Sequence, residues 1–232
     1  MKLNDLKQSV LKANLELVER RLVISTWGNV SGFDAESELM VIKASGVPYD
    51  QMTVEDMVVV DMDGKVVDSK RRPSTDTPTH LYLYKHFAKE GIHGIVHTHS
   101  QFATMWAQSG RSIPCFGTTH GDYYYGDIPC TREMTKDEIV SSYEENTGKV
   151  IIEAMQSTDC VHMSATLVRS HAPFVWGKTS QEAVLHSEVL EYIAKMAFCN
   201  TLLTPDICPI NQVLADKHYL RKFGSGAYYG QN

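Results

Sequence analysis

The sequence predicts an α/β fold, a single layered domain spanning residues 1–232 with a central, largely antiparallel sheet and helices on both faces. Hydrophobic residues make up 43% of the 232 residues and charged residues 22%, which is typical of a globular chain with a full core. Apolar residues recur at helical spacing in some segments and form short buried runs in others. Helices and hairpins are interleaved without strict βαβ alternation, and this favours antiparallel strand pairing.

The N-terminal elements follow from apolar spacing and capping residues. Residues 3–21 are predicted to form a helix, since apolar side chains from Leu3 to Leu17 recur at steps of three and four. Residues 39–42 are a short apolar run typical of a buried strand. Thr53 and its partner Asp56 then form a capping turn before the next apolar run.

A hairpin and a helix are predicted next. An Asp-Gly pair at residues 63–64 separates the apolar runs 58–62 and 65–67, which indicates a tight turn between two strands. Residues 70–76 are a polar loop that contains Pro73. Residues 78–90 are expected to be helical, with Pro78 near the first turn.

The second half continues the same interleaving. Residues 94–99 are predicted to be a strand, residues 101–109 a helix, and residues 113–127 irregular because they are rich in Gly, Thr and Tyr. The remaining predicted elements are a helical region at 135–157 with a break near Gly148, strands at 165–170 and 174–176, and helices at 180–199 and 210–222.

Composition excludes several classes of protein. The chain has 22 basic and 28 acidic residues, and a net charge of −6 argues against nucleic acid as the main partner. No apolar run reaches the ~18 residues of a membrane span, so no membrane partner is expected. The five cysteines are scattered and form no CxxC pair. An odd, scattered set predicts reduced thiols in a cytoplasmic protein.

Histidine placement points to a metal site. His97 and His99 are two residues apart in a predicted strand, so both imidazoles face the same side and could supply half of a tetrahedral Zn²⁺ shell. The alternative is a pair of polar residues on a solvated face. His171 at a strand end and Asp76 before a helix could complete the shell, but they could equally be a structural histidine and an N-cap. Three histidines and a carboxylate suit Zn²⁺, with Mn²⁺ or Fe²⁺ as alternatives.

A second group of short polar segments suits a phosphate monoester. These segments lie at strand or loop ends and offer hydroxyls, backbone N–H groups and one ammonium. No P-loop motif is present, and each segment taken singly is no more than a turn. The candidate phosphate ligands are Gly28, Asn29, Lys43, Ser45, Gly46, Ser74 and Thr75.

A series of ordered motifs covers nearly the whole chain. They are Thr26-Trp-Gly-Asn-Val-Ser31, Lys43-Ala-Ser-Gly-Val47, Pro73-Ser-Thr-Asp-Thr-Pro-Thr-His80, Gly94-Ile-Val-His-Thr-His-Ser100, Gly117-Thr-Thr-His-Gly-Asp-Tyr123, Ser170-His-Ala-Pro-Phe174, Asp216-Lys-His-Tyr-Leu-Arg221 and Ala227-Tyr-Tyr-Gly-Gln231. Together they resemble the class II aldolase/adducin family, and most closely its epimerases. The resemblance implies the layered fold of that family.

The resemblance also implies a reaction. Family epimerases invert a carbinol centre of a phosphorylated ketopentose by retro-aldol cleavage, rotation of the aldehyde and re-addition. A divalent metal on His97, His99 and His171, with Asp76 close to it, would stabilise the enediolate. The family's sugar-phosphate aldolases carry Glu where this chain has Asp76, so the epimerase branch is favoured. Thr75 replaces a serine that is common in that branch but keeps the hydroxyl.

Further roles come from the resemblance alone. It implies Asp122 and Tyr229 as the acid and base for the two faces of the aldehyde, whereas singly they would be a turn residue and a tail residue. Thr118, Glu144 and His218 are implied as supporting residues. The family's homotetramers carry active sites between subunits, and the same is expected here.

Three alternatives remain. A metal-dependent class II aldolase would release its aldehyde. A non-catalytic, adducin-like scaffold protein would be expected to lack the metal ligands. A zinc hydrolase would not need the phosphate-binding segments.

Overall fold

The computed structural model describes residues 3–230 and contains one seven-stranded sheet in the order β4-β3-β2-β1-β5-β7-β6. All six neighbouring pairs are antiparallel, so the predicted sheet type is confirmed. The strands are β1 (Asn29–Asp34), β2 (Leu39–Lys43), β3 (Met57–Val60), β4 (Val66–Asp68), β5 (Gly94–His97), β6 (Ala165–Leu167) and β7 (Pro173–Gly177).

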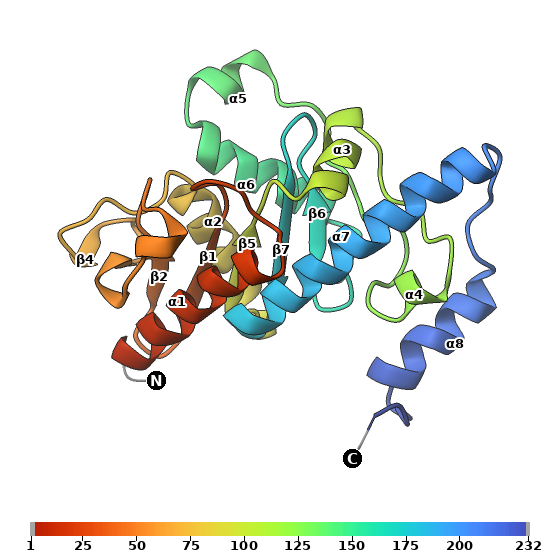
Figure 1. Cartoon of the computed structure of the whole chain (residues 1–232), viewed down its shortest axis with the longest axis horizontal. Coiled ribbons are helices and arrows are strands. Elements are labelled where there is room, and N and C mark those ends of the chain that lie inside the picture. Colours follow the sequence, from red (N-terminus) through yellow and green to blue (C-terminus); the bar gives the residue numbers. More distant parts are fainter. Residues whose placement is uncertain (1–2, 231–232) are drawn as a thin grey trace.

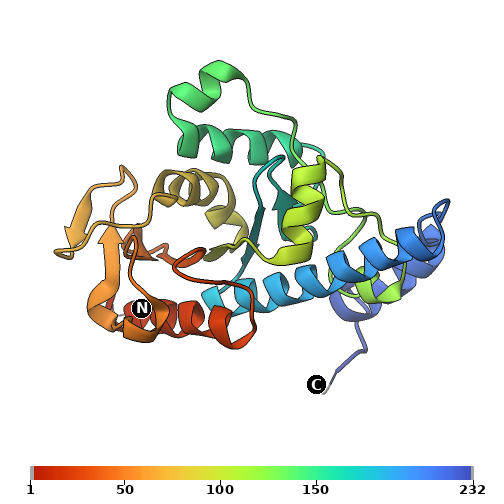
Figure 2. The ribbon, with the colours of Figure 1, turned by 45° about the horizontal axis from the view of Figure 1, so that its top comes forward.

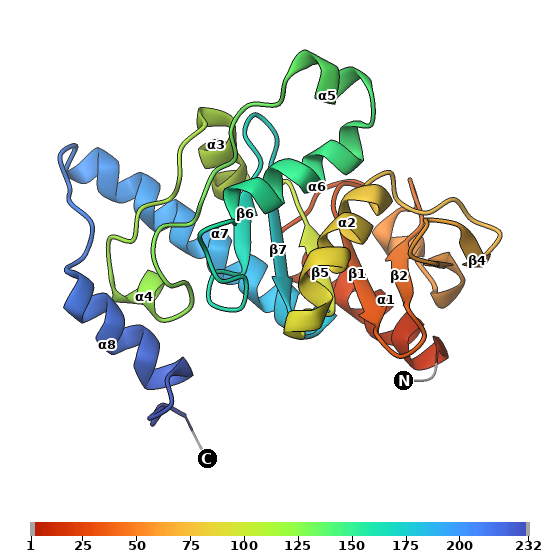
Figure 3. The ribbon, with the colours of Figure 1, turned by 180° about the vertical axis from the view of Figure 1, so that it is seen from behind.

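Helices cover the sheet on both faces, as predicted. In Figures 1 and 2, α1 and α7 lie against one face, and Figure 3 shows α2 and α6 on the other. The α-helices are α1 (Leu3–Glu19), α2 (Thr77–Phe87), α3 (Gln101–Ser109), α4 (Thr118–Gly121), α5 (Lys136–Val140), α6 (Tyr143–Ala154), α7 (Ser180–Leu203) and α8 (Gln212–Phe223). Short 3₁₀ helices are η1 (Tyr49–Gln51), η2 (Val54–Asp56) and η3 (Ala88–Glu90).

Most local predictions are confirmed within a few residues. The capping box of Thr53 and Asp56 precedes β3, and the Asp-Gly turn joins β3 to β4. The five cysteines are free thiols. Within residues 3–230, no helix combines the length and the apolar character needed to cross a membrane.

The strand β1 has no counterpart among the sequence predictions. Its sequence, NVSGFD, contains Ser and Gly and lacks an apolar alternation, yet five of its six residues are buried. Gly32 explains part of this, because a Cβ there would lie 2.7 Å from Val10 and 2.9 Å from Leu6. Helix α1 therefore packs directly on the backbone of β1, and only this tertiary contact identifies the segment as a central strand.

The predicted helix break near Gly148 is wrong. The break falls at residues 141–142, between α5 and α6, and Gly148 lies inside α6. A Cβ at Gly148 would lie 2.8 Å from the Cβ of Tyr82, so glycine is required for the close packing of α6 on α2. The glycine marks a helix–helix contact and not a helix end.

The strand register gathers polar residues at one edge of the sheet. Asn29 of β1 pairs with His97 of β5, which in turn pairs with Phe174 of β7. Lys43 ends the neighbouring strand β2 at the same edge. Segments far apart in the sequence therefore meet where β2 and β5 end and where β1 and β7 begin.

Candidate functional site

A cavity of about 590 Å³ opens at this edge of the sheet. Its wall brings together two candidate groups, the metal ligands and the phosphate ligands. It is lined by Thr26, Trp27, Gly28, Asn29, Lys43, Ser45, Gly46, Ser74, Thr75, Asp76, His97, His99, Tyr143, Glu144 and His171. All four predicted metal residues, all seven predicted phosphate residues and Glu144 therefore share one cavity.

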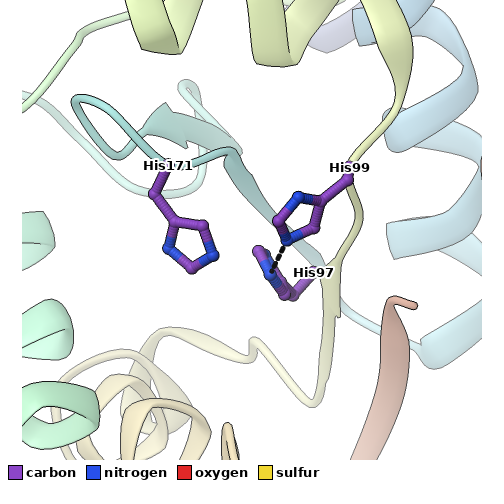
Figure 4. A group of neighbouring side chains, drawn as sticks. All are labelled: His97, His99 and His171. Carbon is purple, nitrogen blue, oxygen red and sulfur yellow. Dashed lines mark hydrogen bonds between the residues drawn. The ribbon is translucent and has the colours of Figure 1, made fainter. Parts of the chain in front are cut away.

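Three imidazoles converge in the cavity (Figure 4). Each of His97, His99 and His171 offers a ring nitrogen, and these atoms lie within 4.8 Å of one another. The Nε2 atoms of His97 and His99 are 3.2 Å apart. Two Zn–N bonds of about 2.0–2.1 Å at a tetrahedral angle place their nitrogens about 3.3–3.4 Å apart, so this spacing fits a shared Zn²⁺.

The outer ring nitrogens have partners that orient the cluster. His97 Nδ1 lies 3.0 Å from the carbonyl oxygen of Pro173 and can donate to it, which leaves Nε2 free to bind a metal. The His97 ring also stacks on Phe174, with centroids 4.3 Å apart. His171 Nδ1 lies 3.4 Å from the hydroxyl of Tyr143. His99 lies beyond the end of β5, so the local chain path and not strand alternation places it beside His97.

The electrostatics favour the neutral form of His99 and His171. Burial, together with the neighbouring His97 and His99, lowers the pKa of His171 to about 4, although Asp76 opposes the shift. Burial and His97 also lower the pKa of His99. A neutral imidazole is the form that binds a metal, so the donor set fits a divalent cation such as Zn²⁺ or Mn²⁺.

Asp76 lies beside the three histidines. Its carboxylate accepts a hydrogen bond of 2.6 Å from the Asn29 amide. The Asp76 oxygens are not part of the three-histidine group, whose ligand atoms lie within 4.8 Å of one another. Burial raises the pKa of Asp76, but His97, His80 and Asn29 more than offset this, and the pKa is lowered. Asp76 occupies the N-cap position of α2 without making a side-chain cap hydrogen bond, so its side chain serves the cavity.

The same cavity also contains Lys43 and the hydroxyl-bearing loops. Lys43 is 2% exposed, and its ammonium donates to the carbonyl oxygens of Thr26 (3.2 Å) and Ala44 (3.4 Å). Burial lowers its pKa, and the charge of Asp76 opposes this shift. Asn29 Nδ2 also donates to Ser74 Oγ at 3.1 Å. This is a buried cation among hydroxyls, which suits a phosphate group.

Glycine is required at Gly28. Its φ of +78° lies in the left-handed region, and a Cβ there would lie 2.7 Å from Val23 and 3.0 Å from the carbonyl oxygen of His97. Tyr49 fixes the preceding backbone, since its hydroxyl lies 3.0 Å from the carbonyl oxygens of both Trp27 and Gly28.

Asp122 and Tyr229 lie elsewhere, together with His218 and Thr118. Asp122 follows α4, which begins at Thr118, and its carboxylate contacts His218 Nδ1 at 3.1 Å and Arg221 at 3.0 Å. The guanidinium of Arg221 lies over the Tyr229 ring, with its Cζ atom 5.0 Å from the ring centroid. None of these residues lines the cavity. Figures 1 and 3 both place α4 and α8 at one end of the molecule, beyond β6 and β7.

Sequence reasoning missed four residues at or next to the cavity. Trp27 is 54% exposed, with its ring centroid 5.9 Å from that of His99. Thr26 and Tyr143 line the wall, and His80 is fully buried behind it. Thr26, Trp27 and His80 belong to the ordered motifs of the sequence, and their place in these motifs is a signal that could have identified them. Only the fold brings Tyr143 to His171.

The buried His120 should make stability depend on pH. It is 4% exposed, its Nε2 donates to the Gly126 carbonyl at 2.8 Å, and burial lowers its pKa to about 4. Between pH 6.5 and 4 the unfolded chain therefore binds a proton that the folded chain does not, so stability falls as the pH falls. The loss for this group is about 2 kcal/mol from pH 7 to pH 5.

Urea unfolding of the metal-free chain at pH 7 and pH 5 measures this loss. His120→Gln keeps an amide donor for Gly126 but cannot titrate. Between pH 7 and pH 5 the free energy of unfolding of this variant should therefore fall by about 2 kcal/mol less than that of the wild type. Equal losses in the two chains would show that His120 is not the group responsible.

Comparison with known proteins agrees with this arrangement. The model of the Class II Aldolase and Adducin N-terminal domain matches residues 8–198. The chain is 52% identical over 226 residues to proteins named L-ribulose-5-phosphate 4-epimerase UlaF from Salmonella paratyphi A and Salmonella typhi. Each match covers 97% of this chain and 98% of the relative.

Solved structures share the fold. An L-fuculose 1-phosphate aldolase superposes with a TM-score of 0.76 at 27% identity and covers 92% of this chain and 95% of its own. YgbL from Klebsiella pneumoniae, described as a putative aldolase/epimerase/decarboxylase, superposes with a TM-score of 0.70 at 20% identity, over 94% of this chain and 99% of its own. The family model, the near full-length relatives and the fold agree, and the chain belongs to the class II aldolase and adducin family.

Proposed function

We propose that this chain is a metal-dependent epimerase that interconverts L-ribulose 5-phosphate and D-xylulose 5-phosphate. One observation carries the proposal: a single cavity is lined both by a three-histidine cluster and by a buried lysine together with hydroxyl-bearing residues. Relatives that are 52% identical over nearly the whole chain are named as L-ribulose-5-phosphate 4-epimerases and support the choice of substrate.

The reaction proceeds by carbon–carbon cleavage. The carbinol C–H at the inverted centre is not acidic, so cleavage, rotation of the aldehyde and re-addition replace direct deprotonation. His97, His99 and His171, with Asp76 beside them, would hold a divalent metal, which would supply Lewis-acid stabilisation of the negative charge that cleavage develops. Zinc is the proposed metal, and the proposed location is the cytoplasm.

The chain's own residues hold the phosphorylated aldehyde during its rotation. The phosphate of the aldehyde fragment is bound by Lys43 and by the hydroxyls of Ser45, Ser74 and Thr75. The aldehyde carbon can therefore rotate while the phosphate end of the fragment stays fixed. Gly28, Asn29 and Gly46 contribute the remaining polar wall.

Replacing Lys43 should impair substrate binding. Lys43→Met keeps an unbranched side chain of similar volume and removes the charged ammonium. We therefore expect KM for L-ribulose 5-phosphate to rise about 10–100-fold, which corresponds to the loss of one buried charge-assisted contact. Steady-state kinetics measure the change. Lys85→Met, on α2 and outside this cavity, is the matched control and should leave KM unchanged. An unchanged KM in Lys43→Met would contradict the phosphate assignment.

Asp122 and Tyr229 are proposed to act on the cavity of a neighbouring subunit. They lie outside the cavity of their own chain, and α7 and α8 expose large apolar side chains suited to subunit contacts. The exposed apolar residues include Tyr192, Leu203, Val213, Leu220 and Phe223. A homotetramer of this single-domain chain would bring the pair to the histidines and help to exclude water. Thr118, Glu144 and His218 are proposed to support the two reacting groups.

A metal-dependent aldolase is the second candidate, favoured by the 27% identical L-fuculose 1-phosphate aldolase. An assay with L-ribulose 5-phosphate, with and without added Zn²⁺ or Mn²⁺, decides between them. The epimerase forms D-xylulose 5-phosphate without accumulating free aldehyde. Accumulation of glycolaldehyde phosphate would favour the aldolase, and no turnover of L-ribulose 5-phosphate with any metal would overturn the epimerase assignment.

A further inference from the structure

Tyr49 contacts the loop of residues 26–28 without lining the cavity itself. The side chain is buried, and its hydroxyl lies 3.0 Å from the carbonyl oxygen of Trp27 and 3.0 Å from that of Gly28. Burial raises the pKa of Tyr49, so the hydroxyl keeps its proton and is the donor to these oxygens. One side chain therefore fixes two successive peptide groups of a loop that lines the cavity.

The same side chain also contacts the ammonium of Lys43. The Nζ atom of Lys43 lies 5.2 Å from the centroid of the Tyr49 ring, a distance at which an aromatic face attracts a cation. Lys43 Nζ in turn donates to the carbonyl oxygen of Thr26 at 3.2 Å. The three carbonyl groups of residues 26–28 are thus bound by two side chains that are themselves in contact.

The hydrogen bonds of Lys43 leave one donor free for a ligand. An ammonium carries three N–H donors, and two of those on Lys43 meet the carbonyl oxygens of Thr26 and Ala44. Without the Tyr49 hydroxyl, the carbonyls of residues 27 and 28 would lose this donor. Lys43 already donates to the adjacent carbonyl and could turn toward them. The Tyr49 hydroxyl therefore keeps the third N–H of Lys43 available.

We propose that Tyr49 is a positioning residue for phosphate binding: its hydroxyl holds the loop of residues 26–28 and its ring holds the ammonium, so that Lys43 directs one N–H into the cavity. The proposal rests on the phosphate site of the proposed function. Lys43 would bind the phosphate directly, and Tyr49 would act through Lys43 without touching the ligand.

Removing the hydroxyl alone tests the proposal, with inorganic phosphate as the probe. Tyr49→Phe keeps the ring, and we expect it to bind phosphate about 3–10-fold more weakly than the wild type, the range of one neutral hydrogen bond. Titration calorimetry on the metal-free chain measures this, because a bound metal would itself attract phosphate. Zn²⁺ affinity, measured by competition with a chromophoric chelator, should stay within twofold of the wild type. A general loosening of the cavity would weaken both.

Tyr124→Phe is the matched control. Tyr124 is also buried, and its hydroxyl donates to a main-chain carbonyl, that of His186, at 2.7 Å. It lies outside the cavity, so its loss should leave phosphate affinity unchanged. The melting temperature of each metal-free chain reports folding separately.

If Tyr49→Phe does not fold, a variant that retains Tyr49 provides the test. Tyr143 is the tyrosine that lines the cavity, and Tyr143→Phe removes its signal. In this variant, labelled with ¹³C at Cζ of tyrosine, inorganic phosphate should shift one tyrosine resonance, because the Tyr49 ring lies against the ammonium that binds phosphate. The shift should disappear when Lys43→Met is added.

Wild-type phosphate affinity in a folded Tyr49→Phe chain would overturn the proposal, as would the absence of a phosphate-dependent tyrosine shift in Tyr143→Phe where that is the variant used. A parallel loss of Zn²⁺ and phosphate affinity would also overturn it. A wild-type chain that binds no inorganic phosphate would reject the phosphate site and this proposal with it. Because no sugar is turned over, a chain that binds phosphate as expected but does not epimerise leaves this proposal intact and rejects only the proposed reaction.

Discussion

Replacing His97 with asparagine is expected to lower kcat for epimerisation by about three orders of magnitude and to remove the bound metal. His97 lies next to both other histidines of the cluster: its Nε2 is 3.2 Å from that of His99, and its ring centroid is 4.8 Å from that of His171. Loss of Lewis-acid stabilisation worth about 4 kcal/mol corresponds to about a 10³-fold loss of rate.

Metal content per chain and steady-state rates measure the effect. His86→Asn, outside the cavity, should keep both at the wild-type level. Stripping the wild-type chain with a chelator should abolish activity, and added Zn²⁺ should restore it, which tests the same point without a mutation. A His97→Asn chain with full metal content and a kcat within tenfold of wild type would contradict the metal assignment.

Mixing two inactive chains should restore activity, because we place the metal ligands on one subunit and Asp122 on the next. An Asp122→Asn chain keeps an intact cavity, and a His97→Asn chain keeps an intact Asp122. In a ring with head-to-tail interfaces, an equal mixture pairs the two intact halves at about one interface in four. Activity should therefore return to about a quarter of the wild-type value.

The control mixture combines lesions within the same cluster. His97→Asn mixed with His171→Asn leaves every cavity with a missing ligand, so no interface recovers. Native mass spectrometry establishes that mixed oligomers form. Mixed tetramers without recovered activity, or a chain that stays monomeric at assay concentration, would reject the shared site.

Several elements were predictable because their signals are local. The helix α1 follows from its apolar spacing, and the β3–β4 hairpin follows from one Asp-Gly pair. In contrast, β1 was missed and the break near Gly148 was misplaced. Both errors involve glycines whose role is a close approach to another element, Gly32 to α1 and Gly148 to Tyr82. Such contacts leave no periodic signal along the chain.

Some parts of the candidate site were likewise predictable from the sequence, and others were not. The HxH spacing of His97 and His99 and the ordered motifs already indicated a metal and a phosphate. The motif resemblance alone implied Asp122 and Tyr229, and no local pattern in the sequence selects them. Tyr143 and the unpartnered Nε2 of His80 became visible only when their neighbours were known.

The sequence by itself determined the residue types and the family, since these are carried by short motifs whose order does not depend on contacts. The tertiary structure alone decided that Gly28 and His171, 143 positions apart, line one cavity. The physical reason is the antiparallel order of the sheet. It sets β2, β1, β5 and β7 side by side, so that the loops at one edge converge. Strand pairing between distant segments is settled by burial of the whole core, and no local pattern encodes it.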